Sequence, residues 1–368
     1  MSLVALFSSQ VFADDVGDEF PVGNKKLYPM VHGRIYIDGQ TYDHSSIPLG
    51  TTVDMGTARL SLGGKIRPFW RYLIQYDFAN RSLKDAWVRY DGLGAPRIKL
   101  GAFQEPFSLE EKTSSRFITF IQRGLPNALV PGYHVGLEAE RRSKLWTGAV
   151  GIFGEPAGSS ITKSGGNASI GVTGRLTWSP VNRERAALHL GLAGTFRVPN
   201  NQHTLRIRET PESALTSVRY INTNHIQGVD HFASGDLEGA FVAGSWSAQA
   251  EYIQTDVTRR NEVLRFRGAY GYISWFPTGE SRNYQEGRFR RVHPLHKAGA
   301  VEIALRYSFL NLNSGSVTGG KEEDATLGIN WYFNSHMRVM LNLIKARAHL
   351  STGTERPNIV LARFQTDF

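Results

Sequence analysis

Apolar and polar residues alternate at period two along most of the chain, as they do in β-strands that have one apolar and one polar face. In "WRYLIQYDFAN" the apolar face carries Trp70, Tyr72, Ile74, Tyr76 and Phe78, and the polar face carries Arg71, Gln75 and Asp77. The segments "VEIALRYSF", "ATLGINWYF" and "VLARFQTDF" repeat this alternation near the end of the chain. Helical periodicity is confined to a stretch around residues 108–123. The pattern therefore predicts an all-β protein.

The alternating segments form about sixteen candidate strands. They lie near residues 31–38, 57–65, 69–79, 84–91, 97–103, 134–142, 145–153, 168–178, 186–197, 235–244, 246–257, 267–277, 299–310, 324–333, 336–347 and 357–368. An even number of antiparallel strands can close into a barrel, and about sixteen strands enclose a water-filled lumen. The expected fold is a transmembrane antiparallel β-barrel of about sixteen strands.

A soluble β-sandwich has the same alternation, so the membrane assignment depends on further features. The predicted strands are about 9–11 residues long, which is the length that crosses a bilayer at a tilt. Aromatic residues gather near strand ends in "PFW", "SWFP", "RYSF" and "NWYF", as they do at the interfaces of a membrane barrel. The polar face is also too rich in charge and glycine for a sandwich core. We therefore expect a multi-pass barrel in the bacterial outer membrane, in contact with its lipid.

The connections alternate between short and long, which is the rhythm of periplasmic turns and extracellular loops in outer-membrane barrels. The long ones are residues 39–56, 104–133, 154–167, 198–234 and 311–323. Two connections break the rhythm. The one after Asn80 is short where a loop is expected, and residues 278–298 are long where a turn is expected.

The N-terminal stretch "SLVALFSSQVFADD" resembles the end of a secretory signal peptide cleaved after Ala13. Its basic start is missing, so we interpret residues 1–13 as a remnant of the signal; a buried N-terminal strand is the alternative. Residues 14–368 are expected to form one barrel domain. The chain has no apolar run of roughly 18 residues, and the absence of cysteine removes disulfides and thiolate metal sites.

Other chemistry finds little support in the sequence. There is no nucleophile elbow, Walker loop or dinucleotide fingerprint, and no cofactor is expected. His293 and His296 in "HPLH" could hold a metal, but the basic run "GRFRRVHPLHK" around them indicates a solvated turn. That run lies on the predicted periplasmic side, where it could gather anions. The net charge of +9 would also suit a nucleic-acid-binding protein. The aromatic residues, however, follow strand periodicity, so no nucleic-acid partner is expected.

Several segments spread over nearly the whole chain carry a family resemblance. They are "HGRIYIDG", "ARLSLGGKI", "GAFQEPFSLEEKTSSRFITFIQRGLPNAL", "LRIRETPES", "YISWFPTGESRNY" and "VEIALRYSFLNLN" with "LGINWYFNSHMRVMLNLIKA". These segments resemble the phosphate-selective porin O/P family of the outer membrane. The resemblance implies a sixteen-stranded barrel, usually a homotrimer, whose third and fifth loops fold into the lumen. It also implies an anion path lined by a ladder of arginines with outlying lysines.

Matched residue by residue, the resemblance assigns a set of arginines to the anion path. The candidates are Arg34, Arg59, Arg116, Arg123, Arg206, Arg208 and Arg219. The first two lie in "HGRIY" and "ARLSL" on strands, the next two in "TSSRFITF" and "FIQRGLP" of the third loop, and the last three in or after "LRIRETPES" of the fifth loop. Family members that select phosphate carry consecutive arginines where this chain has Gly56 and Thr57. A third arginine of the fifth-loop row is also missing near Thr210.

The charges on the polar face support the same interpretation on physical grounds. The inward positions carry Arg34, Arg59, Arg71, Arg89, Arg97, Lys99, Arg175, Arg306 and Arg338, against Asp85, Glu138, Glu140, Glu251 and Glu302. A guanidinium stays charged and offers a planar fork that matches oxyanions. The alternative is that these arginines pair with the carboxylates and stiffen the barrel.

The third loop either folds against the inner wall or caps the barrel from outside. If it folds inward, Glu110 and Glu111 beside Lys112 and Arg116 would place opposite charges at a constriction.

The sequence thus predicts a passive channel for anions, with inorganic phosphate or a related oxyanion as the favoured solute. The alternative within the same class is a general or weakly selective porin for sulfate, pyrophosphate or chloride. A remote alternative is an outer-membrane barrel enzyme, which would need a serine, a histidine and an acid or amide on the outer face. His134 and His189 fall on the inward side of the predicted strands, so we do not expect an enzyme.

Overall fold

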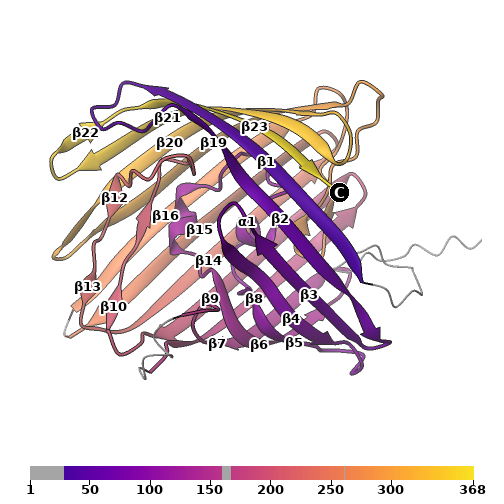
Figure 1. The fold of residues 1–368 in the computed structure, drawn as a ribbon, viewed down its shortest axis with the longest axis horizontal. Helices are drawn as coiled ribbons and strands as arrows, with labels where there is room; N and C mark the ends of the chain where they lie inside the picture. Colours follow the sequence, from indigo (N-terminus) through magenta and orange to yellow (C-terminus); the bar gives the residue numbers. More distant parts are fainter. Residues whose placement is uncertain (1–28, 160–166, 261) are drawn as a thin grey trace, which may run out of the picture.

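The computed structural model describes residues 29–159, 167–260 and 262–368, in which sixteen antiparallel strands close into a barrel (Figure 1). The strands are β1 (Met30–Asp43), β2 (Thr52–Arg67), β3 (Trp70–Asp77), β4 (Ser82–Tyr90), β5 (Arg97–Gln104), β6 (Tyr133–Arg142), β7 (Trp146–Phe153), β8 (Ile170–Arg183), β9 (Ala186–Val198), β14 (Val229–Ala243), β15 (Trp246–Arg259), β16 (Glu262–Trp275), β19 (Ala300–Ser314), β20 (Val317–Tyr332), β21 (Met337–Leu350) and β23 (Asn358–Asp367). The predicted fold class is confirmed. The proposed signal remnant, residues 1–13, lies outside the described residues.

The barrel closes where the last strand pairs with the first, with Arg34–Asp43 antiparallel to Asn358–Asp367. The short strand β22 (Gly353–Glu355) pairs with the end of β21 just before β23 begins. All sixteen predicted segments are strands. Several are longer than predicted, because pairing with the neighbouring strand continues at the loop side beyond the length that crosses a bilayer. In β14, for example, pairing with β15 begins at Val229, six residues before the predicted start.

The two faces of the wall have the predicted polarity. Ile74 and Tyr76 are exposed on the outer face of β3, whereas Gln75 and Asp77 are buried on the inner face. Six outward tryptophans lie at strand ends on one side of the barrel, and they are Trp70, Trp146, Trp178, Trp246, Trp275 and Trp331. This side, which we call the short-turn end, carries connections as short as residues 184–185 and 244–245. The aromatic cluster "RYSF" is an exception, because Tyr307 lies near the middle of β19.

The long connection between β5 and β6, residues 105–132 (L3), lies against the inner wall and contains the helical turns of the described chain. These are α1 (Leu109–Lys112) and the 3-10 helix η2 (Leu125–Leu129). Within residues 108–123, where the sequence has helical periodicity, only Leu109–Lys112 is α-helical. Ser108 caps α1 through the N–H of Glu111, and the Thr113 hydroxyl donates to the Leu109 carbonyl at 2.8 Å, where α1 ends. Within the described residues, no helix has the length and apolarity that a membrane span requires.

The connection between β9 and β14, residues 199–228 (L5), forms two short two-stranded ladders. These pair β10 (Thr204–Leu205) with β13 (Ile226–Gln227) and β11 (Arg208–Glu209) with β12 (Ile221–Asn222). Ile207, Ile221 and Ile226 are buried in one apolar cluster with inward side chains of β15, β16 and β19, such as Val257 and Phe266. The apolar side of L5 thus covers an apolar patch of the inner wall.

The connection between β16 and β19, residues 276–299 (the inserted turn), enters the barrel from the short-turn end. It contains the hairpin of β17 (Tyr284–Gln285) and β18 (Arg288–Phe289), joined by Glu286 and Gly287 with φ of 50° and 78°. Positive φ at both positions is the geometry of a type I′ turn, for which glycine is suited. Tyr284 bonds to Ser179 and His189 of the inner wall at 2.8 and 2.5 Å. The long segment that broke the predicted rhythm is therefore packed inside the lumen.

Candidate functional site

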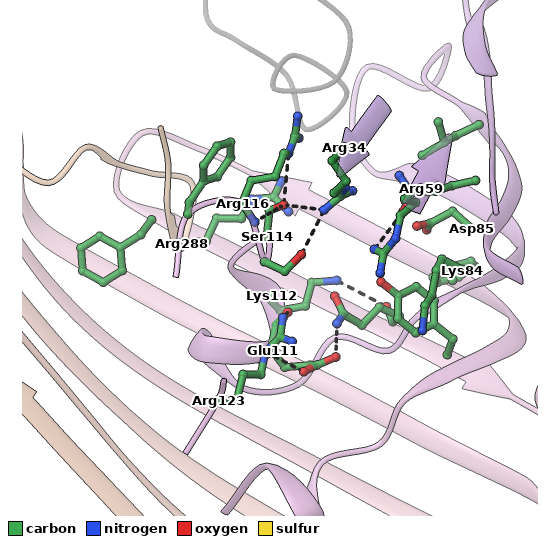
Figure 2. Close-up of a pocket in the computed structure, with 18 of the residues that line it drawn as sticks. Arg34, Arg59, Lys84, Asp85, Glu111, Lys112, Ser114, Arg116, Arg123 and Arg288 are labelled. Atoms are coloured by element: carbon green, nitrogen blue, oxygen red, sulfur yellow. Dashed lines mark hydrogen bonds and ion pairs between the residues drawn. The ribbon is translucent and has the colours of Figure 1, made fainter. Parts of the chain in front are cut away.

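A cavity of about 340 Å³ lies between the inner wall of β1–β5, L3 and the inserted turn (Figure 2). Its lining includes nine basic side chains and two acidic ones. The basic residues are Arg34, Arg59, Lys84, Lys99, Lys112, Arg116, Arg123, Arg288 and Arg290, and the acidic residues are Asp85 and Glu111. Four of the seven predicted arginines (34, 59, 116 and 123) thus meet at one cavity.

Arg34 and Arg116 approach the cavity from the first strand and from L3. The Arg34 Nη1 donates to the Ser115 hydroxyl at 3.1 Å and lies 3.5 Å from the Ser114 hydroxyl. The Arg116 Nη1 is 3.7 Å from the Asp367 carboxylate of β23. Both side chains are buried, so these contacts fix their direction. The serines are neutral, and their hydroxyls orient the Arg34 side chain.

Other cavity-lining cations are paired with wall carboxylates. The Arg59 Nη2 lies 3.0 Å from Asp77, and the Lys99 ammonium lies 2.9 Å from Glu138. The alternative interpretation of the strand arginines, that they pair with lumen carboxylates, therefore holds for these residues. A paired guanidinium still has N–H groups and a residual field, but its attraction for a passing anion is weaker.

Helix α1 brings opposite charges to the cavity. The Glu111 carboxylate forms an ion pair with Arg123, whose Nε lies 2.9 Å away, and Arg123 Nη2 donates to the Glu111 and Thr113 carbonyls at 3.2 Å. Burial opposes the charge of Arg123, but Glu111 and Glu110, with Tyr133 and Tyr36, together outweigh it and raise the pKa of the guanidinium. Lys112 donates to the Gln104 carbonyl at 3.3 Å, and burial lowers its pKa to about 8. Arg123 is a fixed positive charge, whereas the charge of Lys112 is sensitive to pH.

The opposite wall uses its arginines to hold L3. Arg306, Arg338 and Arg363 donate to the carbonyls of Gln122, Ile118 and Ile121, each at 2.9 Å. Asn330 and Gln365 bond to further L3 carbonyls at 2.8 and 3.1 Å. L3 therefore lies against the inner wall of β19–β23, which leaves the β1–β5 side of the lumen open. Arg306 and Arg338 were predicted to face inward and do so, but they anchor the loop and are not among the residues that line the cavity.

The three arginines of the fifth-loop row lie elsewhere. Arg206, Arg208 and Arg219 are exposed on L5 and do not line the cavity. Arg206 Nε donates to the Asn222 side chain at 3.0 Å. Because the alternate residue Ile207 faces the wall, Arg206 and Arg208 point away from it.

Sequence reasoning missed three basic residues of the cavity, whereas Lys112 was expected beside a constriction and does line it. Lys84 stands beside an acid in the sequence, and nothing in the pattern separates it from other lysines. Arg288 and Arg290 belong to "GRFRRVHPLHK", which was interpreted as a solvated turn. That interpretation is wrong for Arg290, which is buried, and for Arg288, which is nearly so; burial together with Arg290 lowers the pKa of Arg288. The unusual length of residues 278–298 was the available signal that the segment packs inside the barrel.

The structure gives a physical reason for the glycine that replaces one of the expected arginines. Gly56 lies at a bulge between β1 and β2, and a Cβ atom there would be 2.1 Å from the carboxylate of Asp38. Asp38 in turn binds Arg363 of the last strand at 2.6 Å. The space that a side chain at position 56 would need is occupied by this ion pair.

The histidines of the barrel have structural partners. His134 lies 2.8 Å from Glu105 and His189 lies 2.9 Å from Glu238, both on the inner face as predicted. His293 and His296 of the "HPLH" segment are exposed.

Comparison with known proteins identifies relatives along nearly the whole chain. The family model described as phosphate-selective porin O and P matches residues 30–368. Porin O of Pseudomonas aeruginosa is 26% identical over 383 residues, which cover 92% of this chain and 87% of that protein. Among solved structures, the anion-selective porin from Comamonas acidovorans aligns with a TM-score of 0.55 and 11% identity over 93% of this chain and 99% of its own. The trimer form of OmpT of Vibrio cholerae aligns with a TM-score of 0.55 and 8% identity, over 92% and 99%.

Proposed function

Because the chain belongs to the phosphate-selective porin O and P family and its barrel is a multi-pass outer-membrane one, we propose that it is a passive channel selective for small anions. The observation that carries this proposal is the cavity between L3 and the β1–β5 wall, which nine basic and two acidic side chains line, so that basic groups remain in excess even though Arg59, Lys99 and Arg116 are paired with wall carboxylates. In a narrow, partly dehydrated passage, such an excess attracts anions and repels cations far more strongly than it would in bulk water. The anion-selective porin that shares the fold supports the same direction of selectivity.

Within this channel, the cavity arginines are the proposed anion-binding groups. Arg34, Arg116 and Arg123 combine permanent charge with N–H groups held in place by L3, so a tetrahedral oxyanion could be bound at two or more oxygens. Conduction also requires release, and several moderate sites in series permit it better than one deep site. The exposed arginines of L5, Arg206 and Arg208 with Arg219, would then collect anions before they enter the cavity.

Inorganic phosphate or a related oxyanion is the proposed favoured solute. The guanidinium groups support an oxyanion, and Gly56 and Thr57 in place of the arginine doublet favour a weaker preference than in phosphate-selective relatives. Sulfate, pyrophosphate and chloride are the competing solutes in the test below. We also propose that the channel is a homotrimer embedded in outer-membrane lipid, on the basis of the family and of the trimeric relative of the same fold.

Single-channel recording in planar bilayers tests the proposal. The reversal potential across a potassium chloride gradient is expected to show preference for chloride over potassium. Phosphate added at millimolar concentration is expected to reduce the chloride current as it occupies the cavity. A reversal potential with cation preference would overturn the anion channel, whereas chloride current that phosphate does not reduce would overturn only the preference for phosphate.

A further inference from the structure

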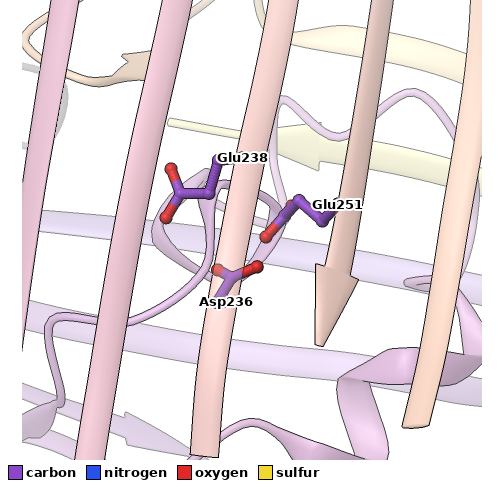
Figure 3. Close-up of side chains that lie close together, drawn as sticks. All are labelled: Asp236, Glu238 and Glu251. Atoms are coloured by element: carbon purple, nitrogen blue, oxygen red, sulfur yellow. The ribbon is translucent and has the colours of Figure 1, made fainter. Parts of the chain in front are cut away.

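Three buried carboxylates meet on the inner wall between β14 and β15 (Figure 3). Glu238 and Glu251 are direct register partners, and Asp236 lies two residues before Glu238 on the same face of β14. One oxygen of each carboxylate lies within 4.8 Å of the other two. Like charges placed opposite each other destabilise an antiparallel pair, so this arrangement needs compensation.

Two of the carboxylates have partners that fix their positions. Glu238 accepts from Arg175 Nε and Nη2 at 2.7 and 2.6 Å and lies 2.9 Å from His189 Nε2. Glu251 accepts from the first two backbone N–H groups of α1, at 2.9 and 2.7 Å. Glu238 therefore belongs to the wall, and Glu251 joins the wall to L3.

Asp236 differs from both. Its side chain is 3% exposed, neither carboxylate oxygen accepts a hydrogen bond from a donor group among the described residues, and the polar group that approaches it is the carboxyl of Glu251. Its register neighbours on the two adjacent strands are Ala193 and Ile253, which offer no polar side-chain atom. A buried carboxylate without a donor or counter-ion is strongly unfavourable. Arg175 alone cannot balance three carboxylates, since it is already engaged on both oxygens of Glu238.

We propose that Asp236, Glu238 and Glu251 bind a hard divalent cation, of which Ca²⁺ is the best fit. Ca²⁺ binds carboxylate oxygens at about 2.3–2.6 Å, so two oxygens on one ion are separated by no more than about 5 Å. The three carboxylate oxygens, which lie within 4.8 Å of one another, are compatible with this requirement. An all-oxygen donor set selects Ca²⁺ or Mg²⁺ over softer metals, and the irregular arrangement suits Ca²⁺ better than the near-octahedral geometry that Mg²⁺ demands.

The cation site connects ion binding to the shape of the passage. Glu251 holds the start of α1, and Glu111 and Lys112 at the end of α1 line the cavity. A cation that neutralises Asp236 removes the repulsion between Asp236 and Glu251 and so keeps this end of L3 in place. The inference is independent of which anion the channel conducts, because the readouts below are metal binding and thermal stability.

The test uses the full chain refolded in detergent without lipopolysaccharide, whose phosphates would also bind Ca²⁺. Titration calorimetry with CaCl2 is expected to show one Ca²⁺ bound per chain, and the thermal unfolding midpoint is expected to fall when EDTA replaces Ca²⁺. Asp236→Asn is nearly isosteric and should weaken Ca²⁺ binding by at least about tenfold. It should also abolish the response of the unfolding midpoint to EDTA.

Asp324→Asn is the matched control, because Asp324 is another buried, inward carboxylate whose two oxygens have no hydrogen-bond partner in the described chain. It lies on β20, outside the cluster, and is expected to leave Ca²⁺ binding and the EDTA response intact. The proposal is overturned if the native chain binds no Ca²⁺ at millimolar concentration, or if the two variants respond alike. A native chain that ignores Ca²⁺ while Asp236→Asn raises the unfolding midpoint would show that a proton shared between carboxyls takes the place of the metal.

Discussion

Arg363 on the last strand donates to both carboxylate oxygens of Asp38 on the first strand, at 2.6 Å each. The two residues are register partners across the seam where the barrel closes, and both are buried. The remaining Nη1 of Arg363 donates to the Ile121 carbonyl of L3 at 2.9 Å. A single guanidinium therefore joins the two ends of the barrel and anchors the loop that narrows it.

Removing the carboxylate of this pair is expected to destabilise the barrel. Asp38→Ala leaves the guanidinium of Arg363 buried without its counter-ion, which costs about 3–5 kcal/mol. Unfolding of the detergent-folded protein in guanidinium chloride measures the loss. Asp54→Ala, an exposed position on the neighbouring strand, should change stability by less than about 0.5 kcal/mol. Equal stability of the two variants would contradict the structural role of the pair.

The exposed arginines of L5 and the buried arginines of the cavity should differ in their dependence on salt. Charges in an open vestibule are screened over about 10 Å at 0.1 M salt and about 3 Å at 1 M, whereas buried charges are screened much less. The double variant Arg206→Gln, Arg208→Gln is expected to have a reduced anion conductance at low salt and a conductance close to the native value at high salt. Arg116→Gln should lower anion selectivity at both salt concentrations. If the effects of the L5 variant and of Arg116→Gln decreased alike as the salt concentration rises, the cavity would not be the selective region.

Anion conductance is expected to fall as the pH rises from about 6 to about 9. Burial raises the pKa of Glu110 to about 7, despite the opposing effect of Arg306, and burial lowers the pKa of Lys112 to about 8. Over this range Glu110 gains a negative charge and Lys112 loses its positive charge, so the net charge of α1 falls by up to two. Glu251 also faces Glu110, and Glu138 and Lys99 face Lys112.

Two variants separate the contributions to this pH dependence. Glu110→Gln should remove the decrease centred near pH 7, and Lys112→Met should remove the one near pH 8. Chloride conductance of single channels, recorded at fixed salt over a pH series, gives both midpoints. A native conductance that rises with pH would show that α1 does not set the field in the passage.

The inserted turn should stabilise L3 through Arg282. This buried arginine donates to the Thr119 hydroxyl and, at 3.1 Å, to the Phe117 carbonyl, and it lies 3.4 Å from Glu302. Arg282→Met should leave the barrel folded but increase open-channel current noise and lower anion selectivity, because L3 and the turn lose their link. Arg185→Met is the control, since Arg185 is exposed and bonds the same turn at the Gly279 carbonyl. Native-like noise in Arg282→Met would contradict this role.

The sequence by itself determined the strands and the direction of their side chains. Alternation at period two is a local property, and a shift of one residue would turn every apolar side chain into the lumen, so the pattern fixes both the strand positions and their inward faces. Gln75 and Asp77 were assigned correctly to the inner face for this reason, as was Arg306. The family resemblance of the L3 motifs likewise assigned Arg116 and Arg123 to the anion path, and both residues line the cavity.

Only the tertiary structure decided which inward charges face the open passage. Arg306 and Arg34 both lie on inward positions of strands, yet Arg306 bonds an L3 carbonyl, whereas Arg34 lines the cavity. Arg290 reaches the same cavity from a turn that the sequence placed in solvent. The alternation along a strand determines which way a side chain points, but the partner comes from another segment, which is 81 residues away for Arg34 and 184 residues away for Arg306. Those long-range contacts determine whether a charge is neutralised, anchors a loop or remains available to an ion.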